Sequence, residues 1–244
     1  NCALDMTFPN GIANPSVPEM MEETGKMVQK HKADLGFAFD GDADRLGVAD
    51  ASGKEIFADR ILAILSKRLL MEKPGAKIVF EVKCTRALSE TIEQYKGVPV
   101  ICKPGHSHIK QKSKEVDASI AGEKSGHIFF FDRYYGFDDA CYTALRVLEA
   151  LDQSGKTLAE LNSEIPLYYS TPTQYAPCAD SVKFQVVERI TQAWKQKYPH
   201  ILDVDGARVE FPDGFFLVRA SSTEPALTIV VEAKTHERML ALDK

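Results

Sequence analysis

The chain lacks the features that mark membrane-spanning, disulfide-stapled and zinc-binding proteins. Its five cysteines are odd in number, spread along 244 residues and contain no Cys-x-x-Cys pair, which argues for free thiols in a reducing compartment. No apolar run approaches the roughly 18 residues that span a bilayer, and no signal peptide is recognisable at the start. We therefore expect a cytoplasmic protein with no membrane partner.

A long basic run is absent as well. The net charge is −5, and an acidic balance without basic patches argues against a nucleic-acid partner. The composition is that of an ordinary globular protein, with 44% apolar and 27% charged residues. At this length the chain can form one large domain or two to three small ones.

Three aspartates alternate with small residues directly after an apolar run. Leu35–Phe39 is typical of a short buried strand, and Asp40, Asp42 and Asp44 follow its carboxyl end, with Arg45 next. Carboxylates this close repel one another, and a divalent cation among their oxygens is the simplest way to keep them ionised. Metal binding is therefore the leading interpretation.

Other interpretations of the acidic stretch depend on the residues that follow. A calcium loop of the EF-hand type needs glycine at its sixth position and glutamate at its twelfth, where Arg45 and Ala51 stand. A phosphatase with Asp40 as nucleophile would resemble the haloacid-dehalogenase pattern, which has threonine or valine at the position of Asp44 and Arg45. The phosphatase and a simple solvated acidic turn stay open as alternatives.

The N-terminal part resembles half of an α/β unit. Ser16 to Glu19 matches a capping box with a proline in the first turn, and it predicts a helix that ends near His31. Strands are expected over residues 35–39 and 46–49. Residues 1–5 start as a strand-like run without methionine, so we expect that the chain begins inside a fold.

Strands and helices alternate from about residue 56, which predicts a second α/β unit with a parallel or mixed sheet. Its expected strands are 77–82, 98–102 and 118–121, and its expected helices are 59–72, 86–95, 138–151 and 158–161. A smaller α+β unit follows, with a helix over 181–198, strands over 201–204, 207–211, 214–218 and 227–232, and a two-residue hairpin turn at Asp205-Gly206. The predicted domains are 1–54, 55–166 and 167–244.

Polar loops follow three strands of the second unit. They are 83–86, 103–107 and 122–127, and in open α/β sheets ligands gather at the carboxyl ends of strands. Together these loops supply a cation, a carboxylate, a hydroxyl and two imidazoles, which suit the binding of sugar hydroxyls and proton transfer. Singly, each of these residues could equally be structural or solvated.

A fourth loop is rich in hydroxyl groups. The stretch 219–225 begins with Arg219 and continues with Ser221, Ser222 and Thr223, which can surround a phosphate with side-chain donors and backbone N–H groups. The alternative is a serine- and threonine-rich turn without a ligand.

The motifs Asp40–Arg45, Gly122–His127 and Arg219–Pro225, in this order, resemble the metal, sugar and phosphate loops of the α-D-phosphohexomutase family. The stretches 82–86, 105–107 and 135–139 resemble its bacterial phosphomannomutase/phosphoglucomutase subgroup. The resemblance implies mixed-sheet α/β domains followed by a smaller α+β C-terminal domain. It also implies exchange between hexose 1-phosphate and hexose 6-phosphate, of mannose, glucose or both, through a phosphoserine and a hexose 1,6-bisphosphate intermediate.

The resemblance assigns roles to individual residues. Mg²⁺ would be held by Asp40, Asp42 and Asp44. Catalytic roles would fall to Arg45, His127 and Lys83, with His127 as the acid or base. Hexose phosphate would be bound by Lys83, His106, Glu123, Ser125, Arg219, Ser221, Ser222 and Thr223.

The sequence also departs from the family pattern. Ala43 stands where glycine is usual, Lys124 where methionine or glutamine is frequent, and Ser222 where asparagine is common. No Ser-His-Asn-Pro-type loop occurs that could carry the phosphoserine. We therefore expect a C-terminal portion whose partners are N-terminal domains of the same protein, and which is inactive alone. The alternative is a non-catalytic module that binds sugar phosphates.

Overall fold

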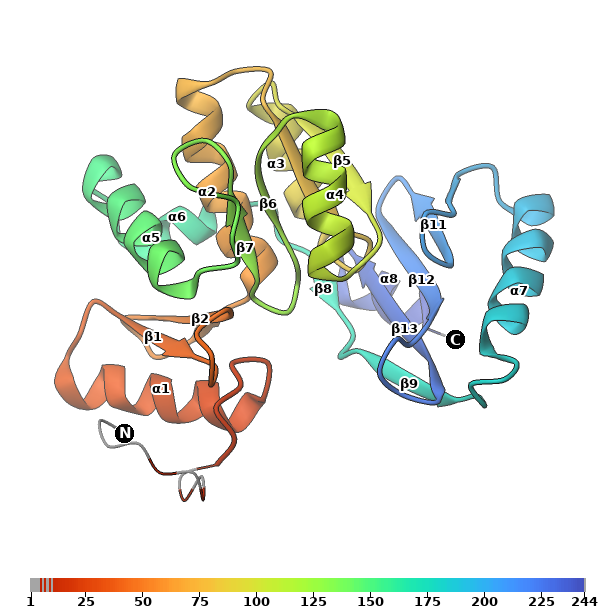
Figure 1. Cartoon of the computed structure of the whole chain (residues 1–244), viewed down its shortest axis with the longest axis horizontal. Helices are drawn as coiled ribbons and strands as arrows, with labels where there is room; N and C mark the ends of the chain where they lie inside the picture. Colours follow the sequence, from red (N-terminus) through yellow and green to blue (C-terminus); the bar gives the residue numbers. More distant parts are fainter. Residues whose placement is uncertain (1–4, 6, 8, 10, 244) are drawn as a thin grey trace.

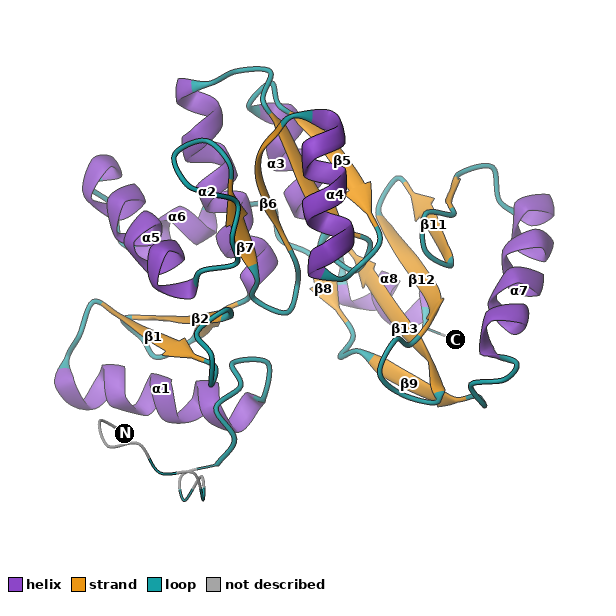
Figure 2. Cartoon of the chain, viewed as in Figure 1, coloured by secondary structure: helices purple, strands orange, loops and turns teal. Residues whose placement is uncertain are grey.

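The computed structural model describes residues 5, 7, 9 and 11–243. The strand-like run expected at the start of the chain lies outside the described residues except for Asp5. Figure 1 and Figure 2 show helices packed on several separate β-sheets, and these sheets follow one another along the sequence. The mixed α/β fold class predicted from the sequence is confirmed.

The first sheet has the order β1-β2-β3, and all of its pairings are antiparallel. Its strands are β1 (Leu35–Phe39), β2 (Leu46–Asp50) and β3 (Glu55–Ile56), and one helix, α1 (Pro18–His31), covers it. Met21 and Val28 of α1 are buried against Ala38 and Ala49 of the strands. This packing fixes where the β1–β2 loop lies.

The capping box predicted at Ser16 is wrong. The N-cap residue is Val17, whose side chain makes no capping hydrogen bond. The Ser16 N–H instead donates to the Asn14 side chain at 3.0 Å, and the Ser16 hydroxyl donates to the carbonyl of Ser125 at 3.3 Å. The Ser16 hydroxyl therefore bonds to a residue that is distant in sequence and does not cap α1.

The second sheet has the order β5-β4-β6-β7, in which β4 runs parallel to both of its neighbours and β7 is antiparallel to β6. The mixed sheet expected for this part is confirmed. The strands are β4 (Lys77–Glu81), β5 (Val98–Cys102), β6 (Ala118–Gly122) and β7 (Ile128–Phe130). The helices are α2 (Ala58–Glu72), α3 (Arg86–Gln94), α4 (His106–Val116), α5 (Ala140–Ser154) and α6 (Leu158–Ser163).

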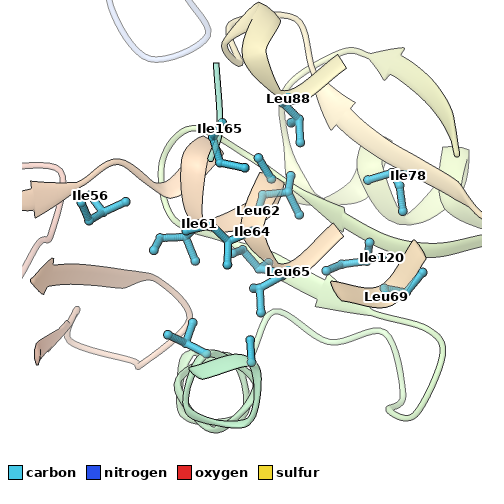
Figure 3. Packing of buried hydrophobic residues seen from close by; sticks show 14 of the residues in the cluster. Ile56, Ile61, Leu62, Ile64, Leu65, Leu69, Ile78, Leu88, Ile120 and Ile165 are labelled. Carbon is cyan, nitrogen blue, oxygen red and sulfur yellow. The ribbon is translucent and has the colours of Figure 1, made fainter. Parts of the chain in front are cut away.

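The main hydrophobic core lies on one face of this second sheet. Alternate strand residues such as Ile78 and Ile120 pack against α2 and α3, because side chains alternate between the two faces of a strand. Figure 3 shows Leu62 and Leu65 of α2 in the middle of this cluster, with Ile56 entering from β3. The other face is covered by α4, so the second sheet is buried on both sides.

The third sheet is antiparallel, with the order β10-β11-β12-β13-β8, and β9 also pairs with β13. Its strands are β8 (Tyr169–Ser170), β9 (Gln174–Pro177), β10 (Ile201–Leu202), β11 (Ala207–Phe211), β12 (Gly214–Ala220) and β13 (Ala226–Ala233). Two helices pack on it, α7 (Lys183–Lys197) and α8 (His236–Leu242). Phe215 and Leu217 of β12 contact Val82 at the end of β4, which joins this sheet to the second unit.

The two-residue turn predicted at Asp205-Gly206 is wrong. Leu202 pairs with Arg208, so the connection between β10 and β11 is longer than two residues. The carboxylate of Asp205 accepts a hydrogen bond from Arg219 on β12. This long-range ion pair fixes the loop, in place of the local turn that the sequence suggested.

Within the described part of the chain, no helix has the length and apolarity that a membrane crossing would require.

Candidate active site

The acidic loop connects β1 to β2 and has a tightly turned backbone. Asp40 Oδ1 accepts the N–H groups of Asp44 at 3.0 Å and Arg45 at 3.1 Å. Ala43 has a φ of 59°, in the left-handed region. These bonds curl the loop so that Asp40, Asp42 and Asp44 each offer an oxygen within 4.8 Å of the others.

This arrangement fits a hard divalent cation such as Mg²⁺, which prefers carboxylate oxygens. Asp44 Oδ1 is buried and accepts no hydrogen bond from any described residue. Burial, a hydrogen bond to Asp40 and the charges of Asp40 and Asp42 raise the pKa of Asp44. Burial opposes ionisation of Asp40 too, but hydrogen bonds from Asp44 and from the loop N–H groups lower its pKa. A cation among these oxygens would remove the repulsion that raises the pKa of Asp44.

The β6–β7 loop lies against the acidic loop, as Figure 1 shows. Leu46 N–H donates to the carbonyl of Gly126 at 3.2 Å. Gly126 has a φ of +107°, and a Cβ there would approach the Leu46 carbonyl oxygen to 3.0 Å, so glycine is required for this contact. The acidic loop and the β6–β7 loop, which are far apart in the sequence, therefore lie in contact.

His127 lies between carboxylates of both loops. Its Nε2 is 3.2 Å from Asp44 Oδ2, and its Nδ1 is 3.1 Å from Glu123 Oε2 and 2.9 Å from Ser125 Oγ. Burial disfavours the charged ring, but the hydrogen bond to Glu123 and the charges of Glu123 and Asp44 raise the pKa of His127 above its usual value. Arg45 Nε lies 3.4 Å from His127 Nε2 and can donate to it when that nitrogen carries no proton.

Arg45 is held over the acidic loop by two carboxylates of that loop. Its Nε lies 3.3 Å from Asp40 Oδ2 and 3.7 Å from Asp44 Oδ1. Its side chain is about one-third exposed, so it can also meet an anion from solvent. The predicted residues of the acidic loop and of the β6–β7 loop thus form one cluster.

Lys83 and Glu123 lie beside the His127 cluster and are held by contacts of their own. Lys83 Nζ is 3.3 Å from the fully buried Glu81, whose charge raises the pKa of the lysine against the effect of burial. Glu123 accepts the N–H of Gly105, and despite its burial the contacts with His127, Gly105 and Lys83 lower its pKa. Both side chains are therefore fixed and charged.

His106 starts α4 and lies 3.8 Å from Asp138, which also binds Lys110 at 2.8 Å. Asp138 further offers an oxygen to the group formed by Asp44 and His127. Asp138 lies in the stretch 135–139, and no role is predicted for it from the sequence. An aspartate just before a helix looks like a capping residue, so sequence alone gave no sign of this contact.

The predicted phosphate loop, residues 219–225, connects β12 to β13. Arg219 is buried, and its guanidinium donates to Asp205 and to the Ser222 hydroxyl at 3.1 Å. Ser221 Oγ accepts the N–H groups of Thr223 and Glu224 and thereby shapes the turn. Asp205 had been interpreted as a turn residue, and only the structure shows that it orients Arg219.

A cavity of about 430 Å³ separates the first turn of α4 from the phosphate loop. It is lined by Lys83, His106, Arg219, Ser221, Ser222 and Thr223 among the predicted residues, and by Pro104, Gly105 and Ser107 of the predicted polar loop 103–107. His108, Thr173, Tyr175 and Thr228 also line it, and sequence reasoning missed them. The predicted residues therefore fall into an acidic cluster with His127 and a basic, hydroxyl-rich cavity. Lys83 belongs to both, since its charge also acts on Glu123.

Three family models match consecutive parts of the chain. Residues 1–53 match phosphoglucomutase/phosphomannomutase alpha/beta/alpha domain II, residues 57–168 match alpha/beta/alpha domain III, and residues 175–244 match the C-terminal domain. A phosphomannomutase/phosphoglucomutase of Pseudomonas aeruginosa is 42% identical over 98% of this chain and 51% of its own length.

Solved structures show the same similarity. A phosphoglucomutase/phosphomannomutase family protein of Burkholderia thailandensis has a TM-score of 0.89 and 38% identity over 98% of this chain and 51% of that chain. The N-acetylphosphoglucosamine mutase of Aspergillus fumigatus, solved with GlcNAc-6P and magnesium, shares the fold, with a TM-score of 0.66 and 18% identity over 89% of this chain and 50% of that chain. The chain thus spans about half the length of these relatives, and it belongs to the phosphoglucomutase/phosphomannomutase family of phosphohexomutases.

Proposed function

We propose that this chain supplies the metal-, sugar- and phosphate-binding parts of an enzyme that interconverts hexose 1-phosphate and hexose 6-phosphate, of mannose, glucose or both. The observation that carries the proposal is the pairing of an acidic cluster around His127 with a basic cavity lined by Arg219. One end suits a transferring phosphoryl group and the other suits a phosphate that does not react. A hexose bisphosphate has both groups, and it is the expected intermediate and activator.

Asp40, Asp42 and Asp44 would hold Mg²⁺. When bound, the ion would neutralise charge on a phosphoryl oxygen. Magnesium and a hexosamine phosphate are named with the Aspergillus fumigatus mutase, which shares this fold. The carboxylate spacing in the present chain supports the same type of ion.

Arg45 and His127 would act on the transferring group. Arg45 is partly exposed and would pair with phosphoryl oxygens, while His127 would give or take the proton of the sugar hydroxyl. Its raised pKa increases the share of the protonated form, which can donate that proton. Lys83 would steady the negative charge from the other side.

The remaining residues would bind the hexose phosphate. Glu123 and Ser125 would accept or donate hydrogen bonds to sugar hydroxyls, and His106 would line the sugar pocket. The non-reacting phosphate would be held by Arg219, Ser221, Ser222 and Thr223. Because the two phosphates of the bisphosphate are alike, the sugar could bind in either orientation.

The phosphoserine would come from N-terminal domains that this chain does not contain, and those domains would be its partners in the cytoplasm. The predicted boundaries at 54/55 and 166/167 remain part of this proposal. Without the serine, the 244-residue chain would bind hexose phosphate but would not turn it over.

A coupled mutase assay tests the proposal. The full-length protein, supplied with Mg²⁺ and glucose 1,6-bisphosphate, should convert glucose 1-phosphate or mannose 1-phosphate, and the 244-residue chain should not. Absence of turnover with both sugars in the full-length protein would refute the activity. Hexose phosphate binding without turnover by that complete protein would instead support the non-catalytic alternative. Turnover by the short chain would refute the assignment of the nucleophile to the absent domains.

A further inference from the structure

The cavity beside α4 is lined by two cationic side chains and by two imidazoles. Lys83 enters it from the end of β4, Arg219 from β12, and the imidazoles of His106 and His108 from α4. No carboxylate belongs to its lining within the described residues. Such a cavity favours an anion with several acceptor oxygens.

The ring of His108 is turned back toward the start of α4. Gly105 has a φ of +110°, and a Cβ built there would lie 3.6 Å from His108 Cδ2. This orientation follows from helix geometry, since side chains lean toward the helix N-terminus. The ring therefore leans toward the loop before α4, and His108 is an exposed residue of the cavity lining.

His108 differs from the other histidines of the site in having no protein partner. His127 is held by Glu123 and Asp44, and His106 lies near Asp138. Among the described residues, no hydrogen bond or ion pair engages the ring of His108. Its ring N–H is thus available to a ligand.

The backbone around His108 adds further donors. The Gly105 N–H is taken by Glu123, and Ile109 is the first residue of α4 whose N–H returns to the preceding turn. The N–H groups of residues 106–108 belong to the part of a helix that has no internal acceptor. Thr173 and Tyr175 bring hydroxyl groups to the same cavity from the C-terminal unit.

We propose that His108 is an additional phosphate-binding residue, which donates a ring N–H to the phosphate held by the Arg219 loop. For the ligand's identity this inference rests on the proposed function, because the phosphate would be the non-reacting group of a hexose phosphate. His108 would thereby link α4 to the C-terminal unit through the bound anion. An anion whose oxygens are placed differently could not accept this hydrogen bond. His108 would therefore contribute to the selectivity among anions.

Phosphate binding by the 244-residue chain tests the proposal directly. The probe is inorganic phosphate, titrated calorimetrically, with circular dichroism confirming that each variant is folded. His108→Ala should weaken binding about tenfold, as expected for the loss of one hydrogen bond to a charged group. His108→Gln, which keeps an N–H donor of similar reach, should recover most of the affinity. His200→Ala, which removes an exposed histidine outside the cavity, is the matched control.

The proposal is overturned if His108→Ala binds phosphate as tightly as the unsubstituted chain, or if the folded chain binds none. In the full-length protein, His108→Ala should raise KM for the hexose phosphate about tenfold and leave kcat within about twofold. A mutase with an unchanged KM would refute the role of His108 and leave the proposed function standing. If phosphate binding depends on His108 but the full-length protein has no mutase activity, the role of His108 stands and the proposed function is refuted.

Discussion

Ala43 has a backbone conformation that L-residues adopt at a cost. Its φ is 59°, and its N–H donates to the Asp40 carbonyl at 3.3 Å, so the acidic loop depends on this left-handed residue. Alanine in this region is less stable than glycine by about 1 kcal/mol. Ala43→Gly should therefore raise the free energy of unfolding by about 1 kcal/mol in urea denaturation.

The control for Ala43→Gly is Ala51→Gly, since Ala51 lies in the next turn and does not have a positive φ. That change should leave the free energy of unfolding unchanged or lower it by a few tenths of a kcal/mol. Equal effects at both positions would contradict the assignment of strain to Ala43.

Asp42 is the most exposed of the three loop aspartates, and within the described residues no protein donor binds its carboxylate. The charge of Asp42 is therefore available to a ligand and does not stabilise the fold through a bond to a protein donor. Asp42→Asn should weaken binding of Mn²⁺, a spectroscopic substitute for Mg²⁺, by about tenfold or more in an electron paramagnetic resonance titration. Asp152→Asn, an exposed aspartate on α5, should leave Mn²⁺ affinity unchanged. Equal affinity of the Asp42 variant and the unsubstituted chain would exclude the acidic loop as the metal site.

At the scale of secondary-structure elements, β13 is connected to α3 by a buried carboxylate. Glu232 accepts the N–H of Arg86, the first residue of α3, at 2.8 Å. Burial raises the pKa of Glu232, with Asp59 adding to the effect and the Arg86 N–H opposing it. The folded state thus holds this proton more tightly than the unfolded state, and ionisation of Glu232 costs stability as the pH rises above the unfolded pKa of about 4.3.

Glu232→Gln keeps an oxygen acceptor for Arg86 and removes the charge. The variant should be more stable than the unsubstituted chain at pH 8, and the difference should shrink toward pH 4, as measured by urea unfolding across that range. Glu237→Gln, at an exposed position on α8, should show no such trend. A Glu232→Gln chain that is less stable at pH 8 would show that the carboxylate stabilises the contact.

At the scale of the whole molecule, Arg208 attaches the C-terminal sheet to the second unit. It is 1% exposed, its Nη1 donates to the carbonyls of Val82 at 2.6 Å and Cys84 at 3.0 Å, and its guanidinium lies 3.6 Å from the centre of the Phe215 ring. Lys83, which lines the cavity, stands in the chain between the two residues whose carbonyls Arg208 binds, so this attachment holds the Lys83 backbone beside the C-terminal sheet.

Arg208→Ala should lower the free energy of unfolding by about 3 kcal/mol, since it leaves buried carbonyls and Glu210 without their donor. Arg208→Lys should lower the free energy of unfolding by less, because lysine keeps the charge. It should still lower it, because lysine lacks the forked geometry of the guanidinium. Chemical denaturation measures both. A loss below 1 kcal/mol for Arg208→Ala would show that the two units are held together by their apolar contact alone.

Local patterns were sufficient for most of the elements and for the predicted site loops. Short apolar runs marked Leu35–Phe39 and Val98–Cys102 at their observed bounds, and the spacing of Asp40, Asp42 and Asp44 pointed to their shared position. These features depend on residues a few positions apart. Where a distant group competed, as Ser125 did for Ser16 and Arg219 for Asp205, the local prediction failed.

The sequence by itself determined most of the strands and helices, the family and the chemistry of each loop, because those follow from neighbouring side chains. Only the tertiary structure decided that His127 lies between Asp44 and Glu123, that Arg208 is buried, and that His108 lines the cavity beside Arg219. Such contacts join residues that are distant in sequence, and their energies arise from burial and charge pairing that exist only once the chain is packed.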